Sequence, residues 1–121
     1  MYYFSYFGNV DKIKKERSDM VFVSISLWCK GWNGKRIKEL APSADILNEY
    51  KYGGGDWSRY EERFNNEILG GRSALKLDKL IKERWGDRDY CFCCYEKSNL
   101  KCHRRLVMEW MMRDGLECRE Y

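Results

Sequence analysis

Residues 20–27, MVFVSISL, decide the fold class, because this run is nearly all apolar and rich in β-branched residues. Such a run is typical of a strand that is buried on both faces of a parallel sheet. Residues 90–95, YCFCCY, have the same character and predict a second buried strand. The aromatic residues 2–7 and the C-terminal residues 116–121 complete the set of expected strands.

Helical patterns occupy the intervals between these strands. Asn9 follows the first strand and can cap the helix that comes after it, and Ser43, Asp56 and Ser73 are placed to cap three more. Residues 73–85 and about 102–114 repeat apolar side chains at helical spacing, and a glycine follows each run. Every interval between expected strands therefore contains at least one helix.

Strands that alternate with helices favour right-handed βαβ units with helices on both faces of the sheet. We therefore expect an α/β fold, with a small, mostly parallel sheet of about four strands in a Rossmann-like three-layer sandwich. A chain of 121 residues fits one domain, so residues 1–121 are expected to form a single α/β domain.

The composition indicates a globular chain with a modest positive charge. Hydrophobic residues make up 44% of it, and 23 basic and 19 acidic residues give a net charge of +4. Because these charges are spread along the sequence, they allow an anionic ligand without requiring nucleic acid. No apolar stretch is long enough to span a membrane and no signal-peptide pattern is visible, so a cytoplasmic protein without a membrane partner is expected. The six cysteines are then expected to be reduced thiols.

Residues 28–38, WCKGWNGKRIK, mix aromatic and basic side chains with glycines, which predicts an exposed loop that could close over a ligand. Lys35 and Arg36 are candidate ligand contacts in this loop. Trp32 and Trp57 could instead stack on nucleic-acid bases. The helical spacing of Trp57 with later aromatic residues favours core packing for that side chain.

Residues 94–105, CYEKSNLKCHRR, hold the side chains best suited to chemistry. They join the carboxyl end of an expected strand to the N-terminus of an expected helix, where α/β proteins bind ligands and where free N–H groups attract anions. Arginine in the first turn of a helix opposes the helix dipole. Arg104 and Arg105 are therefore expected to meet a ligand or a buried carboxylate, for which Glu96 is a candidate.

This region resembles the C-terminal signature of the domain of unknown function family 488. Members of that family carry a cysteine, a following glutamate and a Cys-His-Arg triplet that enters a helix, which match Cys94, Glu96 and residues 102–104. The segments VSISLW, ELAPSADILNEYK and YEERFNNEIL are similar to the middle region of the family. The resemblance implies an α/β fold and a pocket around the Cys-His-Arg loop, and it brings no settled substrate.

The chain departs from the family after Ser26. Leu27 and Trp28 stand there, where family members often have a basic residue. Ser26 itself stays a candidate ligand contact at the end of a buried strand.

The sequence allows two hypotheses for an enzymatic role of the Cys-His-Arg loop. Cys102 could act as a nucleophile with His103 as its base, although a cysteine beside a core is more often inert packing. Alternatively, Glu96 could be a general base or bind a sugar hydroxyl while Arg104 binds a phosphate. A structural Glu-Arg pair would explain the same two residues.

A zinc site is not expected. Cys91, Cys93, Cys94, Cys102 and His103 lack the paired CxxC spacing of zinc knuckles. Alternation along the strand also sends the side chains of Cys93 and Cys94 to opposite faces of the sheet. We expect neither a metal nor a cofactor.

The expected catalytic residues are Glu96, Cys102 and His103. The expected ligand contacts are Asn9, Ser26, Lys35, Arg36, Cys94, Arg104 and Arg105. We expect the chain to bind an anionic, nucleotide-like or otherwise phosphorylated small molecule at the carboxyl ends of the strands, and the sequence leaves open whether it hydrolyses or transfers part of it. The alternative is a non-catalytic protein that sequesters a nucleotide signal or contacts a protein or a nucleic acid. Nucleic acid is the less favoured partner, and a homo-oligomer is compatible with the sequence.

Overall fold

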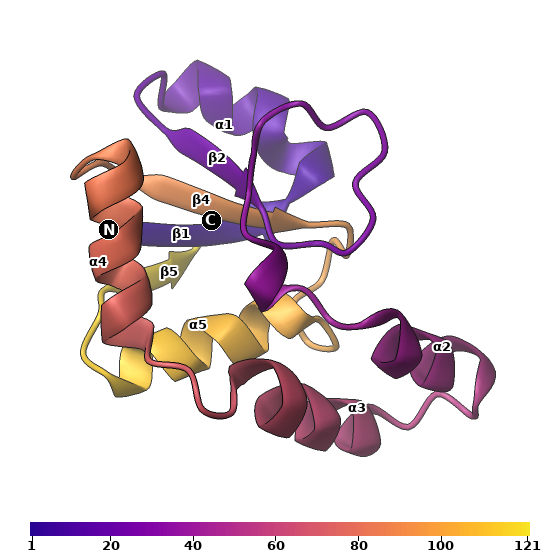
Figure 1. Ribbon diagram of the computed structural model, residues 1–121. Helices are drawn as coiled ribbons and strands as arrows, with labels where there is room; N and C mark the ends of the chain where they lie inside the picture. The colour runs from indigo at the N-terminus through magenta and orange to yellow at the C-terminus, as the bar shows by residue number, and fades with distance from the viewer.

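The computed structural model describes all 121 residues, and its five strands form one parallel sheet in the order β3-β2-β4-β1-β5 (Figure 1). β1 (Tyr2–Tyr6) and β2 (Val21–Ser24) pair with β4 (Tyr90–Cys94), which is buried along its whole length. β5 (Cys118–Glu120) pairs with β1 at one edge, and β3 (Lys35–Arg36) pairs with β2 at the other. The α/β class and the parallel sheet expected from the sequence are confirmed.

The fifth strand, β3, lies inside the segment for which the sequence predicts an exposed loop. Only Lys35 and Arg36 pair with β2, and the Ile37 N–H then donates to the Ser24 carbonyl at 3.0 Å. A two-residue strand has too short a pattern to be recognised by alternation. The strand predicted at residues 20–27 is also shorter in the structure, where β2 ends at Ser24.

Helices connect all the strands except β2 and β3, which are joined by residues 25–34 without a helix. The α-helices are α1 (Val10–Glu16), α2 (Ala44–Tyr52), α3 (Trp57–Arg63), α4 (Ala74–Trp85) and α5 (His103–Arg113). Three shorter elements are the 3-10 turns η1 (Phe7–Asn9) and η2 (Lys38–Leu40) and the π-helical η3 (Phe64–Leu69), which continues α3. The longest helix has 12 residues, and no helix combines the length and apolar composition needed to cross a membrane.

Three of the expected helix caps form and one does not. The Ser73 side chain accepts from the Lys76 N–H at 3.2 Å at the start of α4. The side chains of Ser43 and Asp56 accept hydrogen bonds from the main-chain N–H groups of the helices that follow them. Asn9 precedes α1, but its side chain makes no capping bond. Its amide instead donates to the carbonyl of Tyr121 at 3.3 Å, so the expected capping role of Asn9 is wrong.

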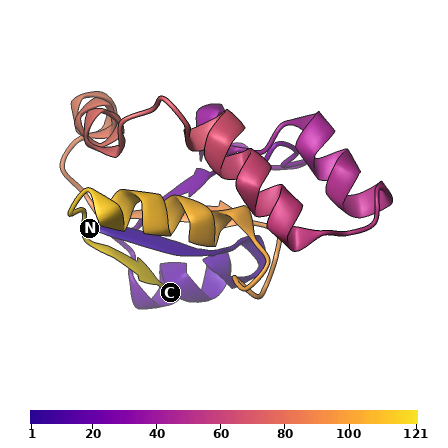
Figure 2. The same ribbon diagram turned by 90° about the horizontal axis from the view of Figure 1, so that it is seen from below.

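The sheet separates two apolar clusters. Figure 2 shows α1 on one side of the sheet and α5 on the other. Cys91 and Cys93 pack with α1, whereas Tyr90 and Phe92 pack with α5 in the larger cluster. This alternation along β4 follows directly from the period of two of a strand. It places Cys94 on the α5 side, opposite Cys93, as the sequence predicts.

A buried arginine fixes the start of α5. The Arg104 side chain is fully buried, and its Nε and Nη2 donate to the Glu120 carboxylate of β5 at 2.8–3.2 Å. Its Nη1 and Nη2 also donate to the main-chain carbonyls of Glu96 and Lys97. A single guanidinium therefore joins the N-terminus of α5, the loop after β4 and the edge strand β5.

We expect Glu120→Gln to lower the free energy of unfolding by about 1–3 kcal/mol, because it removes the carboxylate that compensates a buried guanidinium. Urea denaturation measures the change. Glu117→Gln is the matched control, since Glu117 is exposed and its side chain forms no ion pair. The control should stay within about 0.5 kcal/mol of the wild type. Equal effects of both variants would contradict the role of the Arg104–Glu120 pair.

Candidate functional site

A cavity of about 250 Å³ lies at the carboxyl ends of β2 and β4. Ser26 follows β2, Cys94 ends β4, and Glu96, Cys102 and His103 come from the loop and from the start of α5, and all five line this cavity. The remaining walls come from loop residues and from α2 and α3, which lie toward the carboxyl ends of the strands in Figure 1. Half of the expected site residues are thus brought together in one place.

The sulfur atoms of Cys94 and Cys102 lie 2.8 Å apart in the wall of this cavity, and both side chains are buried. The hydrogen bond from Cys102 lowers the pKa of Cys94 despite burial, and the nearby Arg104 guanidinium, 3.1 Å from the Cys94 sulfur, lowers it further. The same hydrogen bond, together with burial, raises the pKa of Cys102. These shifts favour Cys94 as the thiolate of the pair and Cys102 as the thiol that donates to it.

His103 is buried beside this pair and is neutral. Its Nε2 lies 2.7 Å from the Ile25 carbonyl. Because a carbonyl only accepts, Nε2 carries the hydrogen and the lone pair is on Nδ1, 3.9 Å from the Cys102 sulfur. Burial lowers the pKa of His103 to about 4, and the Arg104 charge acts in the same direction.

The residue that neutralises Arg104 is Glu120, not Glu96. Glu96 contributes only its main-chain carbonyl, and its side chain is exposed at the rim of the cavity. The hydrogen-bonding groups of Arg104 are occupied by protein atoms, and Arg104 does not line the cavity. The guanidinium therefore acts on the site through Cys94.

Four other predicted ligand contacts lie outside the cavity. Asn9 bonds to the C-terminal residue, and the Lys35 ammonium lies 5.6 Å from the centre of the Trp85 ring. Arg36 donates to the Leu27 carbonyl at 3.1 Å. Arg105 lies near the carboxylates of Glu61 and Glu109, at 3.6 and 3.7 Å.

Several further residues line the cavity, and the sequence points to only two of them: Trp57 as a candidate stacking surface and Trp28 as part of the loop that could close over a ligand. Two lysines, Lys51 and Lys101, line the cavity. Much of the wall is aromatic and consists of Trp28, Tyr50, Trp57, Tyr60 and Tyr95. The Nε1 of Trp57 is buried and has no hydrogen-bond partner in the protein. A ligand in the cavity can supply the missing acceptor, because buried indole N–H groups are normally bonded. The helical spacing that favoured core packing for Trp57 gave no sign of this.

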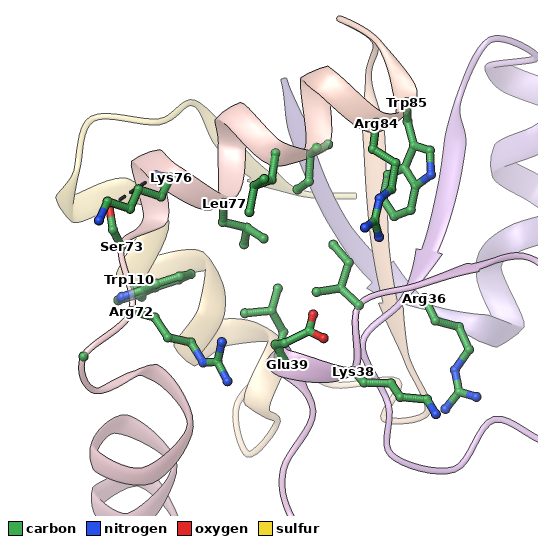
Figure 3. Close-up of a pocket in the computed structure, with 15 residues that line it drawn as sticks. Arg36, Lys38, Glu39, Arg72, Ser73, Lys76, Leu77, Arg84, Trp85 and Trp110 are labelled. Carbon is green, nitrogen blue, oxygen red and sulfur yellow. Dashed lines mark hydrogen bonds between the residues drawn. The ribbon is translucent and has the colours of Figure 1, made fainter.

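A larger hollow of about 670 Å³ lies elsewhere, along α4 (Figure 3). It is lined by neither cysteine nor histidine. The smaller cavity is the candidate active site, because the perturbed thiols and the neutral histidine are there and not in the larger hollow. In neither place do three His, Cys, Asp or Glu side chains come together as a metal site.

A parallel α/β sheet with a thiol pair and a neutral histidine at its carboxyl edge defines an α/β domain with a thiol-based candidate site. The chain belongs to the domain of unknown function family 488: the model of the DUF488-N3a family, described as the active DUF488-N3 subclade, matches residues 9–115. No curated protein matches the chain. No solved structure matches it either.

The pKa of His103 can be measured without assignment, because it is the only histidine. We expect its NMR titration to have a midpoint of about 4 in the folded protein, compared with 6.5 for an ordinary histidine. Since the folded-state pKa is lowered, the stability that neutral His103 allows is present above pH 6.5 and is lost as the pH falls toward 4. The loss should amount to about 3 kcal/mol relative to His103→Gln, which keeps a donor for Ile25. A midpoint near 6.5 would show that the imidazole is not buried.

The thiol pair can be tested by oxidation. We expect hydrogen peroxide to join Cys94 to Cys102: the Cys94 thiolate forms a sulfenic acid, the Cys102 sulfur displaces its oxygen, and the peroxide leaves as water. Mass spectrometry of peptides should show this disulfide before any change at Cys91 or Cys93, whose sulfurs lie 3.8 Å apart. Cys93 has a raised pKa because of Cys91 and burial. Faster oxidation of Cys91 or Cys93 would contradict the assignment.

Proposed function

We propose that the cavity binds a nucleotide-like, anionic small molecule and that the Cys94 thiolate attacks it, so that the protein hydrolyses or transfers part of the ligand. The observation that carries this proposal is the contact of the Cys94 sulfur with both the Cys102 sulfur, at 2.8 Å, and the Arg104 guanidinium, at 3.1 Å. Thiolates and not thiols are the reactive nucleophiles of cysteine, and charged neighbours create them. Cys94 is therefore a better nucleophile than Cys102. The sequence analysis considered Cys102 for that role.

The atoms of such a reaction balance within the cavity. The Cys94 sulfur forms a bond to an electrophilic centre of the ligand, and the leaving group takes the proton of Cys102. Water then attacks the part of the ligand that is bonded to Cys94. The hydroxyl of the water joins the product, the bond to sulfur breaks and leaves its electron pair on Cys94, and the proton of the water returns to Cys102. The Nδ1 lone pair of His103 lies 3.9 Å from the Cys102 sulfur and can accept a hydrogen bond from the Cys102 thiol once Cys94 is bonded to the ligand and no longer accepts it.

The walls of the cavity support a planar, anionic ligand. Trp28, Tyr50 and Trp57 offer ring surfaces on which a base can stack. Lys51 and Lys101 can meet a phosphate. A cavity of about 250 Å³ is smaller than the roughly 300–1,000 Å³ of most small-molecule sites, which favours a mononucleotide over a dinucleotide.

The family match supports an enzyme more than a binding protein. Its description names an active subclade. The alternative, a protein that sequesters a nucleotide without converting it, draws support from the burial of the two sulfurs, which are 1% and 2% exposed. The two functions differ in turnover, so one screen separates them.

The screen measures thermal stabilisation by nucleotides, cyclic dinucleotides, NAD-derived molecules and sugar phosphates, followed by chromatography of each mixture. Ligand at about 100 times its dissociation constant should add about 2.7 kcal/mol of stability. Cys94→Ser should keep the stabilisation and lose roughly 10³-fold or more of any turnover, because it removes the nucleophile. Cys93→Ala, on the opposite face of the same strand, is the matched control and should convert the ligand as the wild type does.

Stabilisation without product in the wild type would favour the sequestering protein. Product formation by Cys94→Ser at the wild-type rate would exclude Cys94 as the nucleophile. No stabilisation by any compound would exclude the small-ligand proposal.

A further inference from the structure

The larger hollow is a cationic groove. It runs between residues 36–40, the segment before α4, α4 itself and Trp110 of α5. Its basic lining residues are Arg36, Lys38, Arg72, Lys76 and Arg84, and its only acidic lining residue is Glu39. We call this site, with these five cations, the α4 groove.

The five cations of the α4 groove are unpaired. Elsewhere, Arg17 pairs with Asp89, Arg63 with three acidic residues, and Arg104 with Glu120. None of the five groove cations lies within 4 Å of a carboxylate oxygen. Two of them, Arg36 and Arg72, only donate to main-chain carbonyls. Their charges are therefore free to meet an anion.

The groove also accounts for the net charge of the chain. Five of its 23 basic residues and one of its 19 acidic residues line the groove. The remaining residues comprise 18 of each sign, so the formal charge of +4 is concentrated here. A concave surface with one sign of charge raises the local concentration of oppositely charged ligands.

Between the cations the groove presents apolar and aromatic side chains. Figure 3 shows Arg72 and Trp110 at one end of the hollow, Arg84 and Trp85 at another, and Arg36 and Lys38 on the side across from α4. Leu77 and the exposed Leu80 lie along the helix. Cations around indole and aliphatic surfaces are the combination by which proteins hold the phosphates and bases of an unpaired strand.

We propose that the α4 groove binds single-stranded nucleic acid, with phosphates at the five cations and bases against the indole and leucine surfaces. A single strand fits better than a duplex, because these cations surround a hollow of about 670 Å³ and a duplex would reach only its rim. The groove contains no residue of the Cys94 cavity. This proposal therefore stands independently of the function proposed above.

The salt dependence of binding follows from the number of cations. Five phosphate contacts to a single strand predict a slope of about −3.5 in a plot of log affinity against log salt. Raising monovalent salt from about 50 to about 200 mM should then weaken binding on the order of 100-fold. Fluorescence anisotropy with a fluorescein-labelled oligothymidylate of about twelve nucleotides measures both quantities.

The double variant Arg72→Ala/Arg84→Ala should bind this strand about 10-fold or more weakly, and its salt slope should fall to about −2, because two contacts are gone. Lys12→Ala/Lys15→Ala removes two exposed cations from α1, on the other face of the sheet, and is the matched control. It should bind within about twofold of the wild type. Cys94→Ser should bind normally, which separates this result from failure of the proposed thiol chemistry.

Equal losses in the groove variant and the α1 variant would overturn the proposal, as would no binding at low salt. A duplex of the same length that binds as tightly as the strand would overturn it too. Displacement of the strand by AMP at the same nucleotide concentration would assign the groove to free nucleotides. Displacement by polyglutamate at the same charge concentration would assign it to an acidic polypeptide, and either result rejects a nucleic-acid site.

Discussion

The guanidinium of Arg104 is completely enclosed by the protein, and the geometry of the candidate site depends on how its charge is satisfied. An uncompensated charge in a protein interior costs several kcal/mol, so it must be paired and hydrogen-bonded. Glu120 supplies the carboxylate, and the carbonyls of Glu96 and Lys97 take the remaining donors. These contacts hold the loop after β4 against the start of α5. The wall that contains Cys94 and Cys102 is formed by this closure.

The same charge determines the chemistry of the wall. Arginine in the first turn of α5 opposes the helix dipole, and the sequence alone shows only this conflict. In the structure the Arg104 guanidinium also lies 3.1 Å from the Cys94 sulfur, where its charge favours the thiolate of Cys94. It also disfavours protonation of His103. One buried cation therefore lowers the pKa of a thiol and of an imidazole at the same cavity, and it adds to the effects of Cys102 on the thiol and of burial on the imidazole.

The sequence predicts the parts of this arrangement that depend on local pattern. The runs at 20–27 and 90–95 identify the central strands, and their period of two places Cys93 and Cys94 on opposite faces. Glu120 could not be identified as the partner of Arg104, because a single carboxylate in a short edge strand has no local signal. The unpaired Nε1 of Trp57 was equally hidden, since helical spacing is the same for a core residue and a cavity wall.

The α4 groove shows the limit of reasoning from composition. An even distribution of charge along the sequence argues against a polyanion as partner, and in this chain the distribution is even. However, an arginine that is neutralised by a neighbouring carboxylate attracts little at a distance, while an unpaired one in a concave surface attracts strongly. Pairing is a tertiary property: residues 36–40, 72–85 and 110 meet only in the folded chain. What attracts a polyanion is the unpaired charge that the fold gathers in one place, and the lining of the α4 groove has five basic residues and one acidic residue.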